Sequence, residues 1–372
     1  MDEIEQLTRQ LVQTPSHDDE TELGIQIEQW LLNHTNADVR RDDAPNGGNI
    51  IATKGNGSPT LAFVGHHDVV PPASRQQHHK EYVVKRRGDR LYGRGTADMT
   101  GALAAAMIGF RNADPDTSIQ FTSFVGEERG GIGAKHAIDS GYQPEYAIIG
   151  EGSAEYETPA GIDIVIAHRG RRELSIITTG TRTHASVPET GANAIYRAAD
   201  AIQDIRNIDP PRITVYGKTL SGSIAATMIS GGTASNTIPD SCTITVDERT
   251  APEQLTDLQS IIRSDNIEIQ CEQHLPAMRC DDPAFAEFMQ DTAVKSQTTD
   301  SKLVTKPHTT DAGRLNQAGT TCVVCGPAEQ GEAHTDTESV SLSALHQCRR
   351  IYQRAFENFG SWTSRNSSFS DV

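Results

Sequence analysis

Four apolar segments of this 372-residue chain are each followed by side chains that can bind a metal ion or move a proton. His66 and Asp68 follow the segment 61–65, Glu127 and Glu128 follow 123–126, Glu151 follows 147–150, and His334 lies in the loop after 322–326. Asp98 lies between the first two segments, just ahead of an alanine-rich stretch. Because ligands of layered α/β sheets bind outside the carboxyl ends of the strands, we expect these side chains to meet at one edge of a sheet.

Besides Asp68, the set contains four carboxylic acids, Asp98, Glu127, Glu128 and Glu151, and their mutual repulsion limits the chemistry that they can perform. Buried like charges a few ångströms apart either take up protons or push the site open, and divalent cations remove that conflict. Mixed ligation by histidine and carboxylate groups suits zinc. Two ions that share one carboxylate would use two histidines and three acids, and the fourth acid would be free to act as a base. The set therefore predicts metal-assisted hydrolysis, in which paired ions generate hydroxide and polarise a carbonyl group.

The apolar segments that carry these residues predict a layered α/β fold. In the first 150 residues, strands are expected at 49–53, 60–65, 118–125 and 146–150, and helices at 4–13, 23–33 and 99–112. Near-continuous apolar strands combined with helices indicate a sheet that is covered by helices on both faces.

A different pattern begins near residue 169. Alternating strands at 173–179, 223–230 and 243–247 flank helices near 192–205 and 252–264, which indicates a smaller α+β unit. We therefore expect a discontinuous catalytic domain, residues 1–168 and 277–372, interrupted by an inserted domain at 169–276. The chain is expected to end in a helix near 341–359 and a loose polar tail.

The charge balance limits the partners of the protein. Its 33 basic and 50 acidic residues give a net charge of −17, which repels phosphate backbones and anionic lipids, so neither a nucleic acid nor a membrane is expected as a partner. The chain has no run of 18 apolar residues and no secretory leader pattern, which predicts a cytoplasmic protein. Acid-rich surfaces that are poor in lysine stay hydrated when salt screens charge, so we interpret the bias as halophilic; simple drift in composition is the alternative.

Two short patterns do not predict cofactor sites. Cys322 and Cys325 lie three residues apart in an apolar segment that is expected to be a strand, so their side chains point to opposite faces and cannot bind the same ion. Gly93-Arg94-Gly95 lacks the third glycine of a phosphate-binding loop, because Asp98 occupies that position. We interpret both cysteines as packing residues.

Eight motifs together resemble the signatures of a known family, the dinuclear-zinc amidohydrolases. This family includes acetylornithine deacetylase, succinyl-diaminopimelate desuccinylase, aminoacylase and carboxypeptidase G. The motifs, which run in the expected order across about residues 1–358, are GHHDVVP (65–71), GRGTADMTG (93–101), GEERGGIG (126–133), GEGS (150–153), THASVP (183–188), GGTASNTIPD (231–240), TDAGRL (310–315) and AHTDTES (333–339).

The resemblance implies a role for each residue of the acidic edge. His66 and Glu151 would bind one zinc ion, Glu128 and His334 would bind the other, and Asp98 would bridge them, with a cis peptide bond between Asp98 and Met99. Glu127 would be the general base that deprotonates the bridging water and then protonates the leaving amine. Asp68 would hydrogen-bond the far ring nitrogen of His66 and so fix its tautomer.

The resemblance also implies that the inserted domain is a lid and dimerisation domain. His184 would stabilise the tetrahedral oxyanion across a homodimer. Asn236 would bind at the oxyanion or the substrate carboxylate, and Arg249 would contact a substrate carboxylate or form a surface ion pair.

The expected function is removal of an acetyl or succinyl group from an N-acylated amino acid by attack of a zinc-bound hydroxide on the amide carbonyl. Cobalt or manganese could replace zinc. A succinyl group calls for an arginine partner, and Arg169, Arg171, Arg172, Arg249 and Arg314 leave that choice open. The alternatives are a dipeptidase or carboxypeptidase on the same scaffold, or a non-catalytic homologue that acts as a binding protein.

Overall fold

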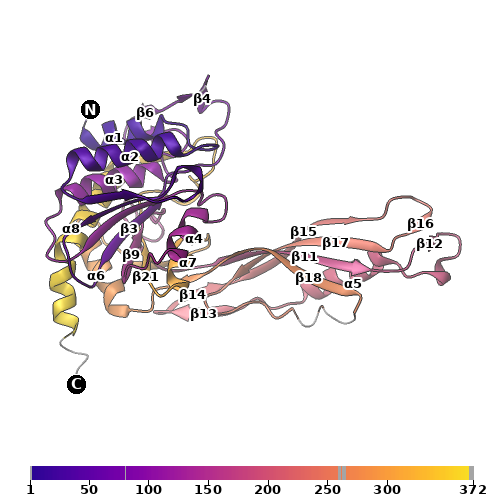
Figure 1. The fold of residues 1–372 in the computed structure, drawn as a ribbon. Helices are drawn as coiled ribbons and strands as arrows, with labels where there is room; N and C mark the ends of the chain where they lie inside the picture. Colours follow the sequence, from indigo (N-terminus) through magenta and orange to yellow (C-terminus); the bar gives the residue numbers. More distant parts are fainter. Residues whose placement is uncertain (1, 80, 259–260, 262–264, 368–372) are drawn as a thin grey trace. The chain divides into compact units, whose positions relative to one another are not determined.

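The computed structural model describes residues 2–79, 81–258, 261 and 265–367. The chain forms two compact units (Figure 1). The first consists of Met1–Ala167, Met278–Lys306 and Thr310–Val372, and the second of His168–Ala277 and Pro307–Thr309. The sequence predicted domain boundaries at 168/169 and 276/277.

A nine-stranded mixed sheet forms the centre of the first unit. Its order is β1 (Asp38–Arg41), β2 (Ile50–Lys54), β8 (Ile119–Phe124), β3 (Leu61–His66), β9 (Tyr146–Ile149), β21 (Thr321–Val324), β10 (Ile164–His168) and β19 (Met278–Arg279), with β20 (Leu303–Lys306) paired to β10. The four central strands β8, β3, β9 and β21 run parallel to one another. Every residue of β3 is buried, as expected for a strand that is covered on both faces.

Helices cover both faces of this sheet (Figure 1). Phe63 of β3 stacks on Phe121 and contacts Tyr352, so this face packs against α8 (Leu342–Ser367) and α3 (Thr100–Asn112). Val64 belongs to a cluster with Ala134 and Leu315, so the other face packs against α4 (Ile132–Asp139) and α7 (Ala312–Gln317). The remaining helices of the unit are α1 (Glu3–Val12), α2 (Thr21–His34) and α6 (Pro283–Val294), with a short 3₁₀ turn η1 (Pro45–Gly47). The predicted layered α/β fold is confirmed.

Short antiparallel ladders lie outside the main sheet of the first unit. A three-stranded sheet joins β6 (Lys85–Arg87), β7 (Arg90–Tyr92) and β22 (Ser339–Ser341), and a small hairpin joins β4 (Gln77–His78) and β5 (Glu81–Tyr82). The pairing of β7 with β22 fixes the segment 335–338 beside the loop that precedes α3, because Gly93 N–H donates to the Glu338 carbonyl oxygen.

The second unit is a four-stranded antiparallel sheet with one helix packed on it. The strand order is β15 (Ser223–Gly231), β17 (Ser241–Thr250), β11 (Gly170–Thr179) and β18 (Ile267–Leu275). Buried and partly buried residues alternate along β17, and the buried face packs against α5 (Ala194–Arg206). The shorter elements are β12 (Thr183–His184) paired with β16 (Thr237–Ile238), β13 (Arg212–Val215) paired with β14 (Lys218–Ser221), and the 3₁₀ turn η2 (Pro188–Thr190).

The helix expected at 252–264 is wrong for the residues that the structure describes. Ala251 and Gln254 form an isolated bridge, and Thr256 N–H donates to the buried Glu248 carboxylate at 2.7 Å instead of to a helical carbonyl. Residues 259–260 and 262–264 of that stretch lie outside the described residues. The neighbouring strand β18 was missed, although it pairs with β11 along its length.

The loose tail expected after residue 359 is also wrong as far as the described chain reaches, because α8 continues to Ser367. Trp362 explains the extra turns: it stacks on Phe288 at 5.1 Å between ring centroids and contacts Phe285 and Tyr146. Residues 368–372 lie outside the described part of the tail. Within the described chain, none of the helices combines the length and the apolar character that crossing a bilayer requires.

Candidate active site

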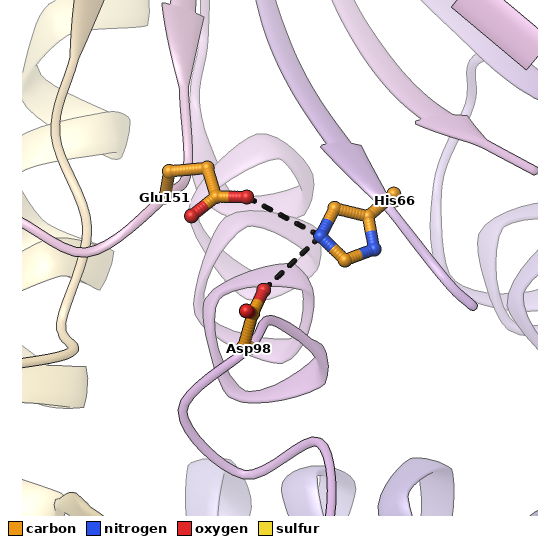
Figure 2. A group of neighbouring side chains, drawn as sticks. All are labelled: His66, Asp98 and Glu151. Atoms are coloured by element: carbon orange, nitrogen blue, oxygen red, sulfur yellow. Dashed lines mark hydrogen bonds and ion pairs between the residues drawn. The ribbon is translucent and has the colours of Figure 1, made fainter. Parts of the chain in front are cut away.

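The parallel strands bring the predicted ligands to one edge of the sheet. His66 is the last residue of β3, and Glu151 comes two positions after β9 ends at Ile149. His66 Nε2 lies 3.1 Å from Asp98 Oδ1 and 3.3 Å from Glu151 Oε1 (Figure 2). Asp98 reaches the group from the turn that precedes α3, and its peptide bond to Met99 is cis.

A second group forms around the other oxygen of the same aspartate. His334 Nε2 lies 2.8 Å from Glu128 Oε1 and 3.2 Å from Asp98 Oδ2. In each of the two groups the candidate ligand atoms lie within 4.8 Å of one another. Each oxygen of Asp98 therefore faces a different histidine, which is the arrangement that a carboxylate shared by two cations requires.

The charges of the two groups fit divalent cations. Burial alone would lower the pKa of His66, but hydrogen bonds to Asp68, Asp98 and Glu151 outweigh it and raise that pKa well above its usual value. Hydrogen bonds to Asp98 and Glu128 raise the pKa of His334 to about 10. The acids thus attract positive charge to the Nε2 atoms, where a divalent cation could replace the protons. Imidazole nitrogens with carboxylate oxygens are a ligand set that zinc accepts.

Glu127 lies beside these two groups, but its carboxylate belongs to neither of them. Burial raises the pKa of Glu127 well above its usual value, and the negative charges of Asp311, Glu151 and Glu128 add to the effect. Among the described residues, no hydrogen bond engages its carboxylate. A carboxylate that is free of partners and has a raised proton affinity suits a general base.

Two carboxylates hold the turn that carries Glu127 and Glu128. The two oxygens of Asp68 accept the backbone N–H groups of Glu127 and Glu128 at 3.0 Å each. The sequence predicted that Asp68 would bind His66. Asp68 Oδ1 does lie 3.3 Å from His66 Nδ1, but the nearer partner of that nitrogen is the Asp68 backbone carbonyl, at 3.0 Å. Asp68 therefore orients the turn as well as the imidazole.

Glu20 is the second carboxylate on this turn, and sequence reasoning missed it. Its side chain is fully buried, accepts the Gly126 N–H at 2.8 Å and forms an ion pair with Arg129. Gly126 has φ 62°, in the left-handed region that favours glycine. Glu20 lies 106 positions before Gly126, in an ordinary helix-start sequence, so no local pattern reveals the contact.

Two further supports of the ligands were missed. Lys306 is buried, with Nζ 3.2 Å from Glu151 Oε2. Glu338 is buried, pairs with Arg94 at 2.5 Å and accepts the Asp98 N–H at 3.1 Å. A sequence pattern could have indicated Lys306, because Lys306 is the last residue of strand β20, just as His66 is the last residue of β3. Glu338 lies inside the AHTDTES motif, but no role was predicted for the acids of that motif.

The predicted substrate residues lie in the second unit. His184 and Thr237 face each other in the β12–β16 ladder, and Ala185 N–H donates to the Asn236 carbonyl oxygen at 2.9 Å, so His184 and Asn236 are close neighbours. The His184 side chain is exposed, with Nδ1 2.7 Å from Ser186 Oγ. Arg249 forms an ion pair with Asp247 at 2.7 Å. The roles of these residues toward a substrate stay predictions.

Replacing Glu20 with glutamine is expected to slow the enzyme and to stabilise its fold. Burial raises the pKa of Glu20 from 4.5 to about 7, so the ionised carboxylate destabilises the folded state above pH 7, and that cost disappears as the pH falls toward 4.5. Glu20→Gln should therefore raise the free energy of unfolding at pH 8 by about 1–2 kcal/mol. It should lower kcat by about tenfold because the 126–129 turn loses its ion pair.

Denaturant unfolding at pH 8 and at pH 5, together with steady-state kinetics, measures both effects. Glu22→Gln, two residues along and exposed, is the matched control and should change neither quantity. A Glu20→Gln enzyme with wild-type kcat would show that Glu20 does not position the turn.

The sequence pattern of the peptidase family M20/M25/M40 matches residues 62–358, which is well over half of the chain. The chain belongs to this family. M20 membership confirms the predicted resemblance to acetylornithine deacetylase and its relatives.

Among the M20 relatives, an acetylornithine deacetylase from Myxococcus xanthus is 27% identical over 336 residues, which cover 84% of each chain. A succinyl-diaminopimelate desuccinylase from Acidiphilium cryptum (strain JF-5) is 28% identical over 331 residues, or 83% of this chain and 85% of the relative. Family membership and these relatives establish an amide-bond hydrolase.

Solved M20 structures share the fold. The aminopeptidase PepT from Bacillus cereus ATCC 10987 superimposes with a TM-score of 0.80 at 20% identity, covering 96% of this chain and 98% of that chain. A dinuclear metal-binding peptidase of the M20 family from Bacillus subtilis superimposes with a TM-score of 0.72 at 16% identity, covering 96% of this chain and 97% of that chain. At these identities the likeness concerns the fold alone.

Proposed function

We propose that this enzyme removes a short acyl group from the amino group of an N-acylated amino acid. The observation that carries the proposal is the pair of histidine–carboxylate groups that share Asp98, with the free Glu127 carboxylate beside them. The deacetylase and desuccinylase names of the full-length relatives support this substrate class over others.

Five residues would hold two zinc ions, and cobalt or manganese could take their place. His66 and Glu151 would bind one ion, Glu128 and His334 the other, and Asp98 both. The ions would supply Lewis acidity, which lowers the pKa of water and polarises the amide carbonyl. Lys306 and Glu338 would hold Glu151 and Asp98 in their positions, by the contacts described above.

Glu127 would move the proton in both halves of the reaction. Its carboxylate would take a proton from the attacking water and then donate it to the amine that leaves. Asp68 and Glu20 would keep the turn fixed while the proton moves. His184 would donate a hydrogen bond to the oxygen that becomes negative, with Asn236 nearby and Arg249 at the substrate carboxylate.

Four of the five candidate arginines already have partners in the structure, which favours an acetyl group over a succinyl group. Arg171 and Arg249 both form ion pairs with Asp247. Arg172 forms an ion pair with Glu248 of the same sheet. Arg314 donates to the Gly130 carbonyl oxygen at 2.7 Å. At these four arginines a succinyl carboxylate would have to displace a partner, whereas an acetyl group needs no cation. Arg169 differs from them, because its buried Nε has no hydrogen-bond partner within the described chain, and it stays a candidate for binding a succinyl carboxylate.

A substrate panel tests this proposal. The zinc-loaded enzyme is offered N-acetylornithine, N-succinyl-diaminopimelate and simple dipeptides, and kcat/KM is measured for each. We expect the acetylated amino acid to give the highest value. A preference for dipeptides would instead support a peptidase, the second candidate, on the same scaffold. No turnover of any substrate, with metal bound, would support a non-catalytic binding protein.

We also propose that the enzyme is a homodimer joined through the second unit. Strand β15 lies at the edge of its sheet, and eight of its nine residues are exposed. Met228 and Ile229 on this strand are 64% and 54% exposed, and Tyr196 on α5 is 70% exposed. An unpaired edge beside large apolar side chains is suited to pairing with a second copy.

Met228→Lys should convert the dimer to a monomer, since it places a charge at the paired edge. Light scattering measures the mass of the variant. Steady-state kinetics tests whether His184 acts across the interface, because the monomer should lose activity if it does. Lys218→Gln, on β14 away from that edge, is the control and should stay dimeric. A wild-type enzyme that is monomeric and fully active would contradict both the dimer and the role of His184 in trans.

The charge excess of −17 supports a cytoplasmic protein from a salt-rich cell. The unfolding midpoint should then rise when KCl is increased to molar concentrations. An unfolding midpoint that stays constant or falls with added KCl would indicate that the acidic composition arose by simple drift in composition.

A further inference from the structure

A small pocket lies in the first unit, on the three-stranded sheet that joins β6, β7 and β22. Its volume is about 240 Å³. Its walls come from β6, from the end of β7, from the loop ahead of β22 and from residues 75–76. The residues that line it include Arg75, Lys85, Arg87, Tyr92, Asp336 and Glu338.

The pocket gathers basic side chains in a protein that is strongly acidic. Lys85 and Arg87 are two positions apart on β6, so they lie on the same face of the strand. Arg86, between them, lies on the opposite face and forms an ion pair with Glu5 at 2.6 Å. Within the described chain, no carboxylate lies within ion-pair distance of Lys85 or Arg87. Both side chains are exposed, so an anion in solution can reach the two cations from the same side of the strand.

Arg87 is arranged to bind a planar anion. Its guanidinium carbon lies 5.6 Å from the centroid of the Tyr92 ring. Stacking covers the face of a guanidinium group and leaves the N–H groups of its edge free. Those N–H groups match two oxygens of one carboxylate or phosphate, which bind as a bidentate pair.

The acids that line the pocket are already neutralised. Asp336 pairs with Arg75 at 2.8 Å, and Glu338 pairs with Arg94 at 2.5 Å. Neither acid is therefore left to repel an incoming anion or to pair with Lys85 or Arg87. We propose that this pocket binds a small oxyanion, presented by a carboxylate or phosphate group, between Lys85 and Arg87.

Isothermal titration of the zinc-loaded enzyme tests the site, with inorganic phosphate in one arm and malonate in the other. The titration uses the lowest KCl concentration at which the enzyme stays folded, because salt screens exposed charges. Arg87→Gln and Lys85→Gln should each weaken binding by about tenfold, since each removes a charge-assisted hydrogen bond. Arg86→Gln carries the same charge change on the opposite face and should alter the affinity less than about twofold.

The two arms separate the sources of the oxyanion. Binding in the phosphate arm alone would assign a phosphate ester, and binding in the malonate arm alone an organic carboxylate. Absence of binding in both arms would overturn the proposal. Binding that is equally strong in the Arg87→Gln, Lys85→Gln and Arg86→Gln enzymes would also overturn it, because the anion would then be bound elsewhere, for instance at the zinc ions. None of these outcomes depends on which amide the enzyme hydrolyses.

Discussion

Glu127→Gln is expected to lower kcat by about 10²–10⁴-fold while the metal content of the enzyme stays unchanged. Glutamine keeps the size of the side chain but cannot accept and return a proton. Glu127 belongs to neither of the two candidate ligand groups, so its loss leaves all five proposed ligands in place. The effect should therefore appear in kcat, with little change in KM.

Kinetics and elemental analysis of the same preparation measure this prediction. Glu287→Gln, at an exposed position of α6, repeats the chemical change away from the site and should leave both quantities unchanged. A Glu127→Gln enzyme that retains activity would require another group to serve as the base. An enzyme that loses both activity and metal would make Glu127 a ligand.

Asp98→Asn is expected to remove both metal ions and to abolish activity. Asp98 is the one residue that the two candidate groups have in common, with Oδ1 3.1 Å from His66 Nε2 and Oδ2 3.2 Å from His334 Nε2. An asparagine side chain has the same shape but is neutral and has one oxygen in place of two. Loss of a shared ligand should lower the affinity for both ions by at least about tenfold to a hundredfold.

The metal content after dialysis distinguishes this residue from the others. His334→Ala is the comparison, because it removes a ligand from one group only and should leave about one ion per chain. Retention of two ions by Asp98→Asn would show that the carboxylate does not bridge them. Circular dichroism of both variants checks that the sheet is intact.

Sequence patterns predicted that these side chains meet at one edge of the sheet because a general rule governs where parallel strands end. His66, Glu128 and Glu151 each follow a buried parallel strand, and parallel strands end at the same edge, so distant positions converge without any contact being known. The layered fold followed from the same buried strands. These predictions depend on local patterns that repeat along the chain.

The missed features depend on contacts between distant residues. Glu20 contacts the 126–129 turn although it lies more than one hundred positions earlier in the chain. The last turns of α8 are stabilised by the contacts of Trp362 with Phe288 and Tyr146. The helix expected at 252–264 is wrong in its described part for a similar reason, since buried Glu248 accepts the Thr256 N–H that a helix would have used. Tertiary contacts overrode local propensity at each of these places.

The measurement that tests the central claim most directly is anomalous X-ray diffraction from crystals of the zinc-loaded enzyme, collected at the zinc edge. We predict two peaks, one among His66, Asp98 and Glu151, and the other among Asp98, Glu128 and His334. A map without peaks there, or with zinc bound only at other residues, would contradict the dinuclear site on which the proposed reaction depends.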